Sequence, residues 1–203
     1  MHQGVTAESA SVDRRLARLI TNVFAPAQVV GVLLVVVALD STRTVSAAVG
    51  WSFLTVGIAV LIPFAYVLRG VRRRHFTDIH VGQREQRSVP ILIGIGSIFV
   101  SLALLIILGA PRELVALVAA MTGGLLVTLL VTLAWKISVH AAVASGAVVI
   151  LALVFGPVLL AMGVLAGLIC WARVKLTDHS VPQVVAGAVL GAVVAASVFT
   201  LIR

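Results

Sequence analysis

Long apolar runs separated by short polar junctions recur along the whole chain. The runs cover residues 19–39, 47–68, 91–108, 114–135, 141–155, 157–172 and 184–202. A helix needs about 20 apolar residues to cross the hydrocarbon core of a bilayer. In lipid, every backbone polar group must be satisfied within its own segment, so helices are the expected element. The pattern therefore predicts an all-α, polytopic transmembrane bundle of about six or seven spans, six if one segment is re-entrant.

The boundaries between these runs carry further signals. Residues 141–172 are too many for one ordinary span, and Gly156 with Pro157 divides them. The first run is full length and shows no clear small-residue cleavage site, so we interpret it as an uncleaved span. We therefore predict a cytoplasmic N-terminal tail over residues 1–18 and a single transmembrane domain over residues 19–203.

Two pairs of glycines lie four residues apart in the last two runs. They are Gly163 with Gly167, and Gly187 with Gly191. Small residues at this spacing let two helix backbones approach closely. We interpret both pairs as sites of ordinary helix packing.

The composition supports a membrane protein. The chain of 203 residues is 61% hydrophobic and only 11% charged, with a mean hydropathy of +1.20, whereas soluble domains carry roughly 25% charged residues. The net charge is +8. Because the basic residues flank apolar runs, they indicate topology rather than nucleic-acid binding. The single cysteine, Cys170, excludes an intrachain disulfide.

The basic residues are distributed unequally between the two ends of the predicted spans. Seven spans would place twelve on one side: Arg14, Arg15, Arg18, Arg69, Arg72, Arg73, Arg74, Arg84, Arg87, Lys136, Arg173 and Lys175. Three would lie on the other: Arg43, Arg112 and Arg203. The positive-inside rule then predicts a cytoplasmic position for the N-terminus and the polar junctions. A bacterial plasma membrane is the expected location.

Three polar patches on that side carry residues suited to chemistry. They hold His80 with Arg87, Ser138 with His140, and Arg173 with His179. Each patch lies near the end of a predicted span, so bundle packing is expected to bring the three together. Ionisable groups at membrane depth are functional candidates. Arginine forks match phosphate oxygens, one histidine can act as a nucleophile, and a second can act as a general acid.

The order of these patches resembles the type 2 phosphatidic acid phosphatase superfamily of membrane lipid phosphatases. That family has the motifs Lys-x6-Arg-Pro, Pro-Ser-Gly-His and Ser-Arg-x5-His-x3-Asp. The third is the clearest here, with Arg173 and His179 at the matching positions and an Ala-Gly-rich helix following. The second resembles Ser138-Val139-His140. The first would be His80-x6-Arg87, with Ser88 in place of proline. The resemblance covers about residues 70 to 200.

The resemblance implies a role for each matching residue. It makes His179 the nucleophile and His140 the general acid, and it implies no cofactor or metal. It assigns phosphate binding to four residues: Arg87, Arg173, His80 and Ser138. Two positions depart from the family. His80 replaces a lysine, and Gln183 replaces the aspartate that orients the nucleophile. The candidates for this orienting role are Gln183 itself, Asp178 and Asp78.

The resulting expectation is a membrane-embedded, metal-independent phosphatase. It would hydrolyse a prenyl or glycerolipid phosphate or diphosphate through a phospho-histidine, with membrane lipids and a possible second copy of the chain as its other partners. One alternative is a prenyl-diphosphate cyclase or transferase on the same scaffold, although no DDxxD metal motif is present. Another is a non-catalytic protein that binds lipid phosphates. A requirement for magnesium would distinguish the cyclase or transferase from the phosphatase. Turnover would distinguish the phosphatase from the non-catalytic binding protein.

Overall fold

Helices form all of the regular structure in the part of the chain described by the computed structural model. It describes residues 2–76 and 88–203, with side chains for residues 12–76, 89–90 and 92–203. The elements in chain order are α1 (His2–Val23), α2 (Pro26–Ser41), α3 (Val45–Val56), a π-helical segment (Gly57–Leu61), α4 (Ile62–Arg72), α5 (Ser88–Ile107), α6 (Arg112–Ala134), α7 (Val139–Phe155), a 3-10 segment (Pro157–Met162), α8 (Gly163–Lys175) and α9 (Val181–Ile202).

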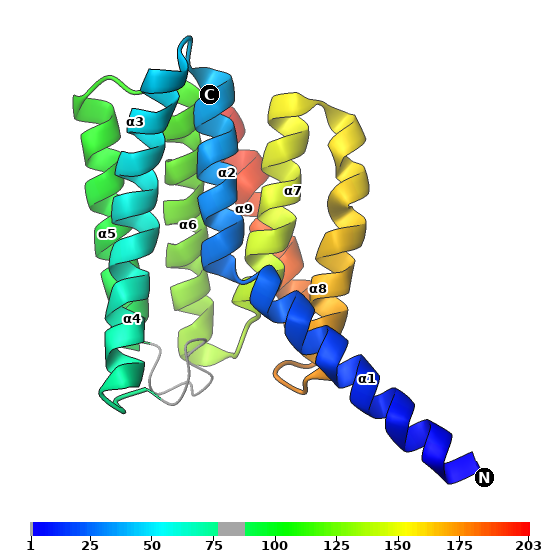
Figure 1. Cartoon of the computed structure of the whole chain (residues 1–203). Coiled ribbons are helices and arrows are strands. Elements are labelled where there is room, and N and C mark those ends of the chain that lie inside the picture. The colour runs from blue at the N-terminus through cyan, green and yellow to red at the C-terminus, as the bar shows by residue number, and fades with distance from the viewer. Residues whose placement is uncertain (1, 77–87) are drawn as a thin grey trace.

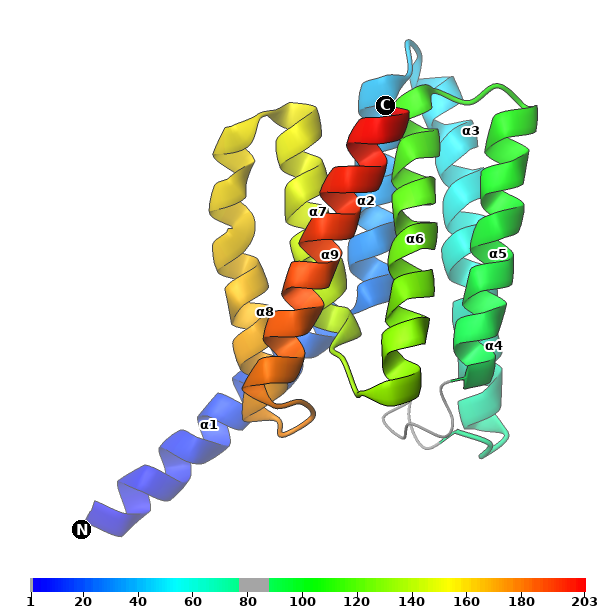
Figure 2. The same cartoon turned by 180° about the vertical axis from the view of Figure 1, so that it is seen from behind.

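The helices from α2 to α9 run side by side, as expected for a membrane bundle (Figures 1 and 2). Four continuous helices are long and apolar enough to cross a membrane: Val45–Arg72, Arg112–Ala134, Pro157–Lys175 and Val181–Ile202. A bent pair formed by α1 and α2 makes a possible fifth, while Leu92–Ile107 and Val139–Phe155 are shorter apolar helices. The predicted all-helical architecture is confirmed for the described residues, which contain four to five candidate membrane spans, and the predicted count of six or seven is not confirmed.

The first predicted span, residues 19–39, is not one straight helix. The chain breaks after Val23, and the axes of α1 and α2 differ by 43°. Pro26 explains the break, because proline lacks an N–H group and disfavours the helical conformation at the residue before it. Ala25 accordingly adopts extended φ and ψ angles of −65° and 149°.

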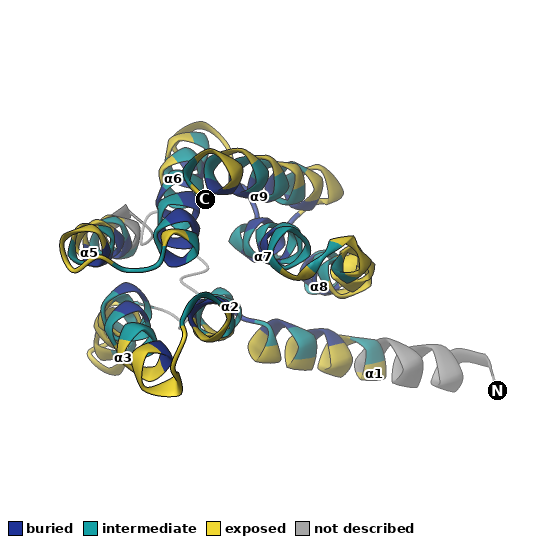
Figure 3. Cartoon of the chain, turned by 90° about the horizontal axis from the view of Figure 1, so that it is seen from above, coloured by how far each residue is buried: buried dark blue, intermediate teal, exposed yellow. Residues whose placement is uncertain are grey.

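Helix α1 continues through residue 18, where the sequence predicts the end of a tail, and packs against α8. Ala17 and Thr21 are buried, whereas Arg14, Arg15 and Arg18 are exposed. Figure 3 shows this division between a buried and an exposed face. The Lys175 ammonium lies 2.7 Å from the Asp13 carboxylate and joins the two helices.

The polar junctions gather at one end of the bundle. Figure 1 shows α4 ending, α5 beginning, α6 connecting to α7 and α8 connecting to α9 at the end where α1 departs. The α2–α3 and α5–α6 connections and the C-terminus lie at the other end. The predicted division at Gly156 is present, since this residue ends α7 with a φ of 110°. The described basic residues therefore concentrate at one end, as the sequence predicts.

The closest helix contact lies between α7 and α9, at one of the two predicted glycine pairs. A Cβ atom on Gly187 would lie 2.5 Å from the Ser138 carbonyl oxygen, and one on Gly191 would overlap the Ala142 carbonyl. By contrast, a Cβ on Gly163 or Gly167 would meet no atom within 4 Å. Close packing is therefore found at Gly187 and Gly191 and not at the α8 pair.

This contact predicts a difference between two identical substitutions. Gly191→Ala should destabilise the protein by about 2 kcal/mol, because the added methyl group must displace the backbone of α7. Gly167→Ala should be neutral or slightly stabilising, because alanine has the higher helix propensity and its methyl group meets open space. Thermal unfolding of the two variants in detergent measures the difference, and equal melting temperatures would contradict the packing described here.

Candidate functional site

The connection between α8 and α9 forms a tight turn around the Arg173 carbonyl. The backbone N–H groups of Asp178 and His179 both donate to this oxygen, at 3.2 and 3.3 Å. Thr177 adopts a left-handed φ of 59° and reverses the chain. The turn places His179 directly before α9, with only 7% of its surface exposed. Nearly buried histidines in a membrane-end loop are candidates for chemistry.

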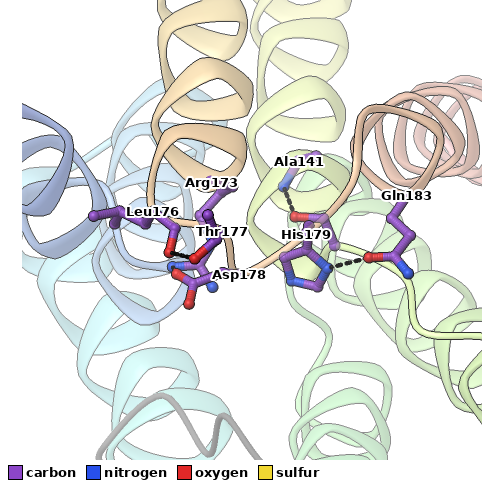
Figure 4. Close-up of polar contacts among 8 residues, drawn as sticks. Ala141, Arg173, Leu176, Thr177, Asp178, His179 and Gln183 are labelled. Carbon is purple, nitrogen blue, oxygen red and sulfur yellow. Dashed lines mark hydrogen bonds and ion pairs between the residues drawn. The ribbon is translucent and has the colours of Figure 1, made fainter. Parts of the chain in front are cut away.

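Gln183 links the start of α9 to the histidine ring. Its side-chain oxygen, Oε1, accepts the Ser180 backbone N–H at 3.1 Å, as in the capping arrangement of many helix N-termini. The same oxygen lies 3.3 Å from Nδ1 of His179 (Figure 4). Because a backbone N–H can only donate, the atom that receives it is the amide oxygen rather than the amide nitrogen. Gln183 therefore presents an acceptor to Nδ1.

This contact favours one tautomer of His179. An acceptor facing Nδ1 favours the proton on Nδ1, and in a neutral imidazole the other nitrogen, Nε2, is then the acceptor atom of the ring. An aspartate at this position would favour the same tautomer and also stabilise positive charge on the ring. The amide of Gln183 supplies the orientation without the charge.

The start of α7 packs against the same cluster. Ser138 is fully buried and caps α7, its hydroxyl oxygen accepting the Ala141 backbone N–H at 3.4 Å. The Ser138 backbone N–H donates to the Gln183 carbonyl at 3.3 Å. His140, also buried, follows in the first turn of α7. The predicted second and third patches thus meet through Ser138 and Gln183.

Arg173 has a carboxylate partner within the cluster. Its Nη1 atom lies 3.0 Å from the Asp178 carboxylate, with 8% and 43% of the two side chains exposed. In the view of Figure 4, His179 lies between this pair and Gln183. Of the residues proposed to orient His179, Gln183 contacts the ring, whereas Asp178 contacts the guanidinium. A guanidinium is a planar group of N–H donors that suits phosphate as well as carboxylate oxygens.

The first predicted patch lies outside the described residues. It comprises His80 and Arg87, and these two residues and Asp78, a candidate for orienting His179, fall within residues 77–87. The helices that flank this segment, α4 and α5, end and begin at the end of the bundle that holds the cluster (Figure 1). The roles assigned to these three residues stay predictions.

The cluster suits an anion. The N-termini of α7 and α9 meet there, and helix N-termini carry partial positive charge and unsatisfied N–H groups. Arg173 adds a full positive charge that Asp178 partly offsets. Among the described residues, no group of three or more His, Cys, Asp or Glu side chains is arranged to hold a metal ion. The donors present therefore favour phosphate over a cation.

An apolar cavity of about 320 Å³ lies inside the bundle next to this cluster. Its lining comes from α2, the π-helical segment, α4, α5, α6, α7 and α9. One lining residue, Val139, stands between Ser138 and His140 in the chain. The pattern of the sequence does not predict this cavity. Its lining residues look like any other apolar span positions, and only the packing of distant helices creates the space.

Comparison of the chain with protein-family models, with curated proteins and with solved structures finds no match in any of the three. The resemblance to the lipid phosphatases therefore depends on the residues of the three patches alone.

The Gln183 contact predicts a change in the His179 ring that can be measured without substrate. In protein labelled with ¹⁵N-histidine, the His179 signals should show the tautomer protonated at Nδ1. Gln183→Leu removes the acceptor, so the two tautomers should become more equally populated. Comparison with His179→Ala assigns the signals. An unchanged tautomer in Gln183→Leu would show that Gln183 does not orient the ring.

Proposed function

We propose that this protein is a membrane-embedded phosphatase that hydrolyses a lipid phosphate or diphosphate, without a metal, through a phospho-histidine intermediate. The observation that carries the proposal is the contact of Gln183 Oε1 with Nδ1 of His179, beside the nearly buried Arg173. With the proton on Nδ1, Nε2 is the nitrogen that we assign as the nucleophile, and Arg173 is the side chain that we assign to phosphate binding.

The proposed reaction has two steps. In the first, the Nε2 lone pair of His179 attacks phosphorus, a P–N bond forms, and the bond from phosphorus to the lipid oxygen breaks. His140, acting as an acid, gives a proton to the departing alkoxide. In the second, His140 removes a proton from water, whose oxygen attacks phosphorus and releases phosphate from His179. Charge on the phosphoryl oxygens is stabilised by Arg173, by the N–H groups at the start of α7 and by Arg87.

Two observations support a lipid as the substrate. The bundle has at least four helices suited to a membrane, and the polar cluster lies at one end of them (Figure 1). The apolar cavity adjoins the cluster. A phosphate at the cluster and a hydrocarbon chain between the helices would match the two halves of a lipid phosphate.

We further propose that α5 and α7 cross the membrane with the longer helices, giving about seven spans in all. Both helices run alongside the longer ones over the height of the bundle (Figures 1 and 2). With the basic end in the cytoplasm, as the positive-inside rule expects, the active cluster and the N-terminus would face the cytoplasm of a bacterial cell.

A second candidate function, binding of lipid phosphate without turnover, is favoured by one observation. The residue that contacts Nδ1 of His179 is an amide and not a carboxylate. In serine proteases, replacing the corresponding aspartate by asparagine lowers kcat by about 10⁴. A site with this loss would still bind phosphate through Arg173 and the helix N-termini.

Phosphate release by the purified protein tests the proposal directly. The substrates are a panel of lipid phosphates and prenyl diphosphates, each with EDTA or with magnesium. We expect release in EDTA, and we expect His179→Ala to lower it by at least about a thousandfold, because the nucleophile is lost. His75→Ala is the matched control, since His75 is an exposed histidine outside the cluster.

Three other outcomes would decide against this mechanism. Release that persists in His179→Ala would exclude the phospho-histidine. Tight binding of lipid phosphate with no release would favour the binding function. Conversion of a prenyl diphosphate only in magnesium, with a cyclised or transferred product, would favour the cyclase or transferase alternative.

The amide at position 183 predicts a gain of activity on substitution. Gln183→Asp should raise kcat about tenfold, because the carboxylate stabilises positive charge on the His179 ring as phosphorus is attacked. The same negative charge should raise KM, because it repels the phosphate of the substrate. Steady-state kinetics of Gln183→Asp and Gln183→Asn measure both effects. A fall in kcat with Gln183→Asp would show that the amide is required for more than orientation.

A further inference from the structure

The apolar cavity lies within a ring of helices and is partly open. Proceeding around the ring, α2, the α3–α4 unit, α5, α6, α9 and α7 each pack against the next, and α7 packs back against α2 (Figure 3). Among the described residues that line the cavity, Thr128 has the only polar side chain. Such a lining offers dispersion contacts and no partners for charged or strongly polar groups. Such a lining suits a hydrocarbon.

The cavity is elongated along the helix axes. On α7 the lining residues run from Val139 to Ile150, and on α6 they run from Thr128 to Leu117. At 1.5 Å per residue, each wall is about 16 Å long. The volume of about 320 Å³ is thus spread along roughly half the thickness of a hydrocarbon core. This shape fits an extended chain better than a compact ligand.

The two ends of the cavity differ. Leu33, Leu117 and Ile150 line the end in the middle of the bundle, and at most 6% of each is exposed because they belong to the hydrophobic core. At the other end, Phe64 is exposed and Val139 is partly exposed. The cavity therefore has one end buried in the hydrophobic core and a more exposed end near Val139, which lies between Ser138 and His140 in the chain.

An unusual backbone feature contributes one wall. Ala59 and Val60 line the cavity from the π-helical segment Gly57–Leu61, which interrupts an otherwise α-helical span. Segments of π-helix are rare and occur frequently at functional sites. This feature favours a binding chamber over a simple packing defect.

Building on the proposed function, we infer that the cavity takes the chain of a single-chain lipid phosphate, alkyl or prenyl, and that Gly124 sets the length of chain accepted. One elongated chamber holds one chain, so a two-chain glycerolipid such as phosphatidate has no place for its second chain. With the phosphate at Arg173 and His179, the chain passes Val139 and extends toward Ile150.

Gly124 stands at the position where a side chain would block the chamber. It lies one helical turn beyond Thr128 on α6, toward the buried end, and it lines the cavity. A Cβ atom added there would meet no atom within 4 Å, so a larger residue would fill the chamber without displacing the backbone. Gly167 on α8 is a matched control, because it is exposed, does not line the cavity and also has no atom within 4 Å of an added Cβ.

The test uses the full chain in phosphatidylcholine nanodiscs and a dodecyl phosphate that carries a diazirine at the end of its chain. Irradiation should label residues near the buried end, between Leu117 and Met121 on α6 or between Ala147 and Ile150 on α7. Competition by unlabelled alkyl phosphates should show affinity that depends on chain length, whereas phosphatidate should compete poorly. Labelling confined to lipid-facing residues of α8 or α9 would overturn the inference.

Two leucine variants test the role of Gly124 in setting the chain length. Gly124→Leu should weaken binding of dodecyl phosphate about tenfold, a difference of about 1.4 kcal/mol, and should change binding of octyl phosphate much less. Gly167→Leu should leave both unchanged. Equal effects of the two variants, or equal effects on the two ligands, would contradict the role of Gly124.

Parallel measurement of phosphate release separates this inference from the proposed function. Labelling of the buried end without phosphate release in any condition would support the chain-binding site and exclude the phosphatase function. Phosphate release with labelling only on the outer faces of the bundle would support the phosphatase function and exclude the chain-binding site.

Discussion

The contact between the backbones of α7 and α9 is the constraint on which the candidate site depends. The Ser138 carbonyl occupies the space that a side chain at position 187 would need, and the Ala142 carbonyl does the same at position 191. This approach lets the Ser138 N–H reach the Gln183 carbonyl. Residues about 40 positions apart in the chain are thereby brought together: the Ser138 and His140 patch meets the His179 patch. A single methyl group at either glycine would force the two patches apart.

Gln183 joins the folding of α9 to the proposed chemistry. Its side chain satisfies the Ser180 N–H at the start of the helix, its carbonyl receives Ser138, and its amide oxygen faces the His179 ring. The first two interactions fix the position of the third. The orientation of the ring is thus set by the helix terminus itself, which is a rigid support for a catalytic group. A substitution at this position changes stability and chemistry together.

Some of this arrangement follows from the sequence, and some does not. Apolar length and the glycine-proline pair at residues 156 and 157 predict the helices and their division, because these signals are local. The bend at Pro26 also has a local cause, the proline itself. The apolar run continues across this residue, however, so the run alone predicts one uninterrupted helix. The glycine pairs show the opposite case. Gly163 and Gly187 begin pairs of identical spacing, and only the second faces another helix closely.

The same distinction applies to the polar residues of the site. The spacing of Arg173 and His179 suggested that they act together, and the turn around the Arg173 carbonyl explains why this spacing works. Spacing could not tell which side chain would contact the ring. Asp178 is adjacent to His179 in sequence, yet its carboxylate reaches Arg173, while Gln183 reaches the ring from one turn into α9. Adjacent residues in a tight turn point in different directions, whereas a residue four positions on returns to the same side at the helix start.

The charge balance of the cluster gives a physical reason for an amide at position 183. Asp178 already offsets the charge of Arg173, so a second carboxylate would leave the described part of the cluster with a net negative charge. At an effective dielectric constant of 20, a unit charge 4 Å from a phosphate contributes about 4 kcal/mol of repulsion. A neutral acceptor orients His179 and avoids this cost.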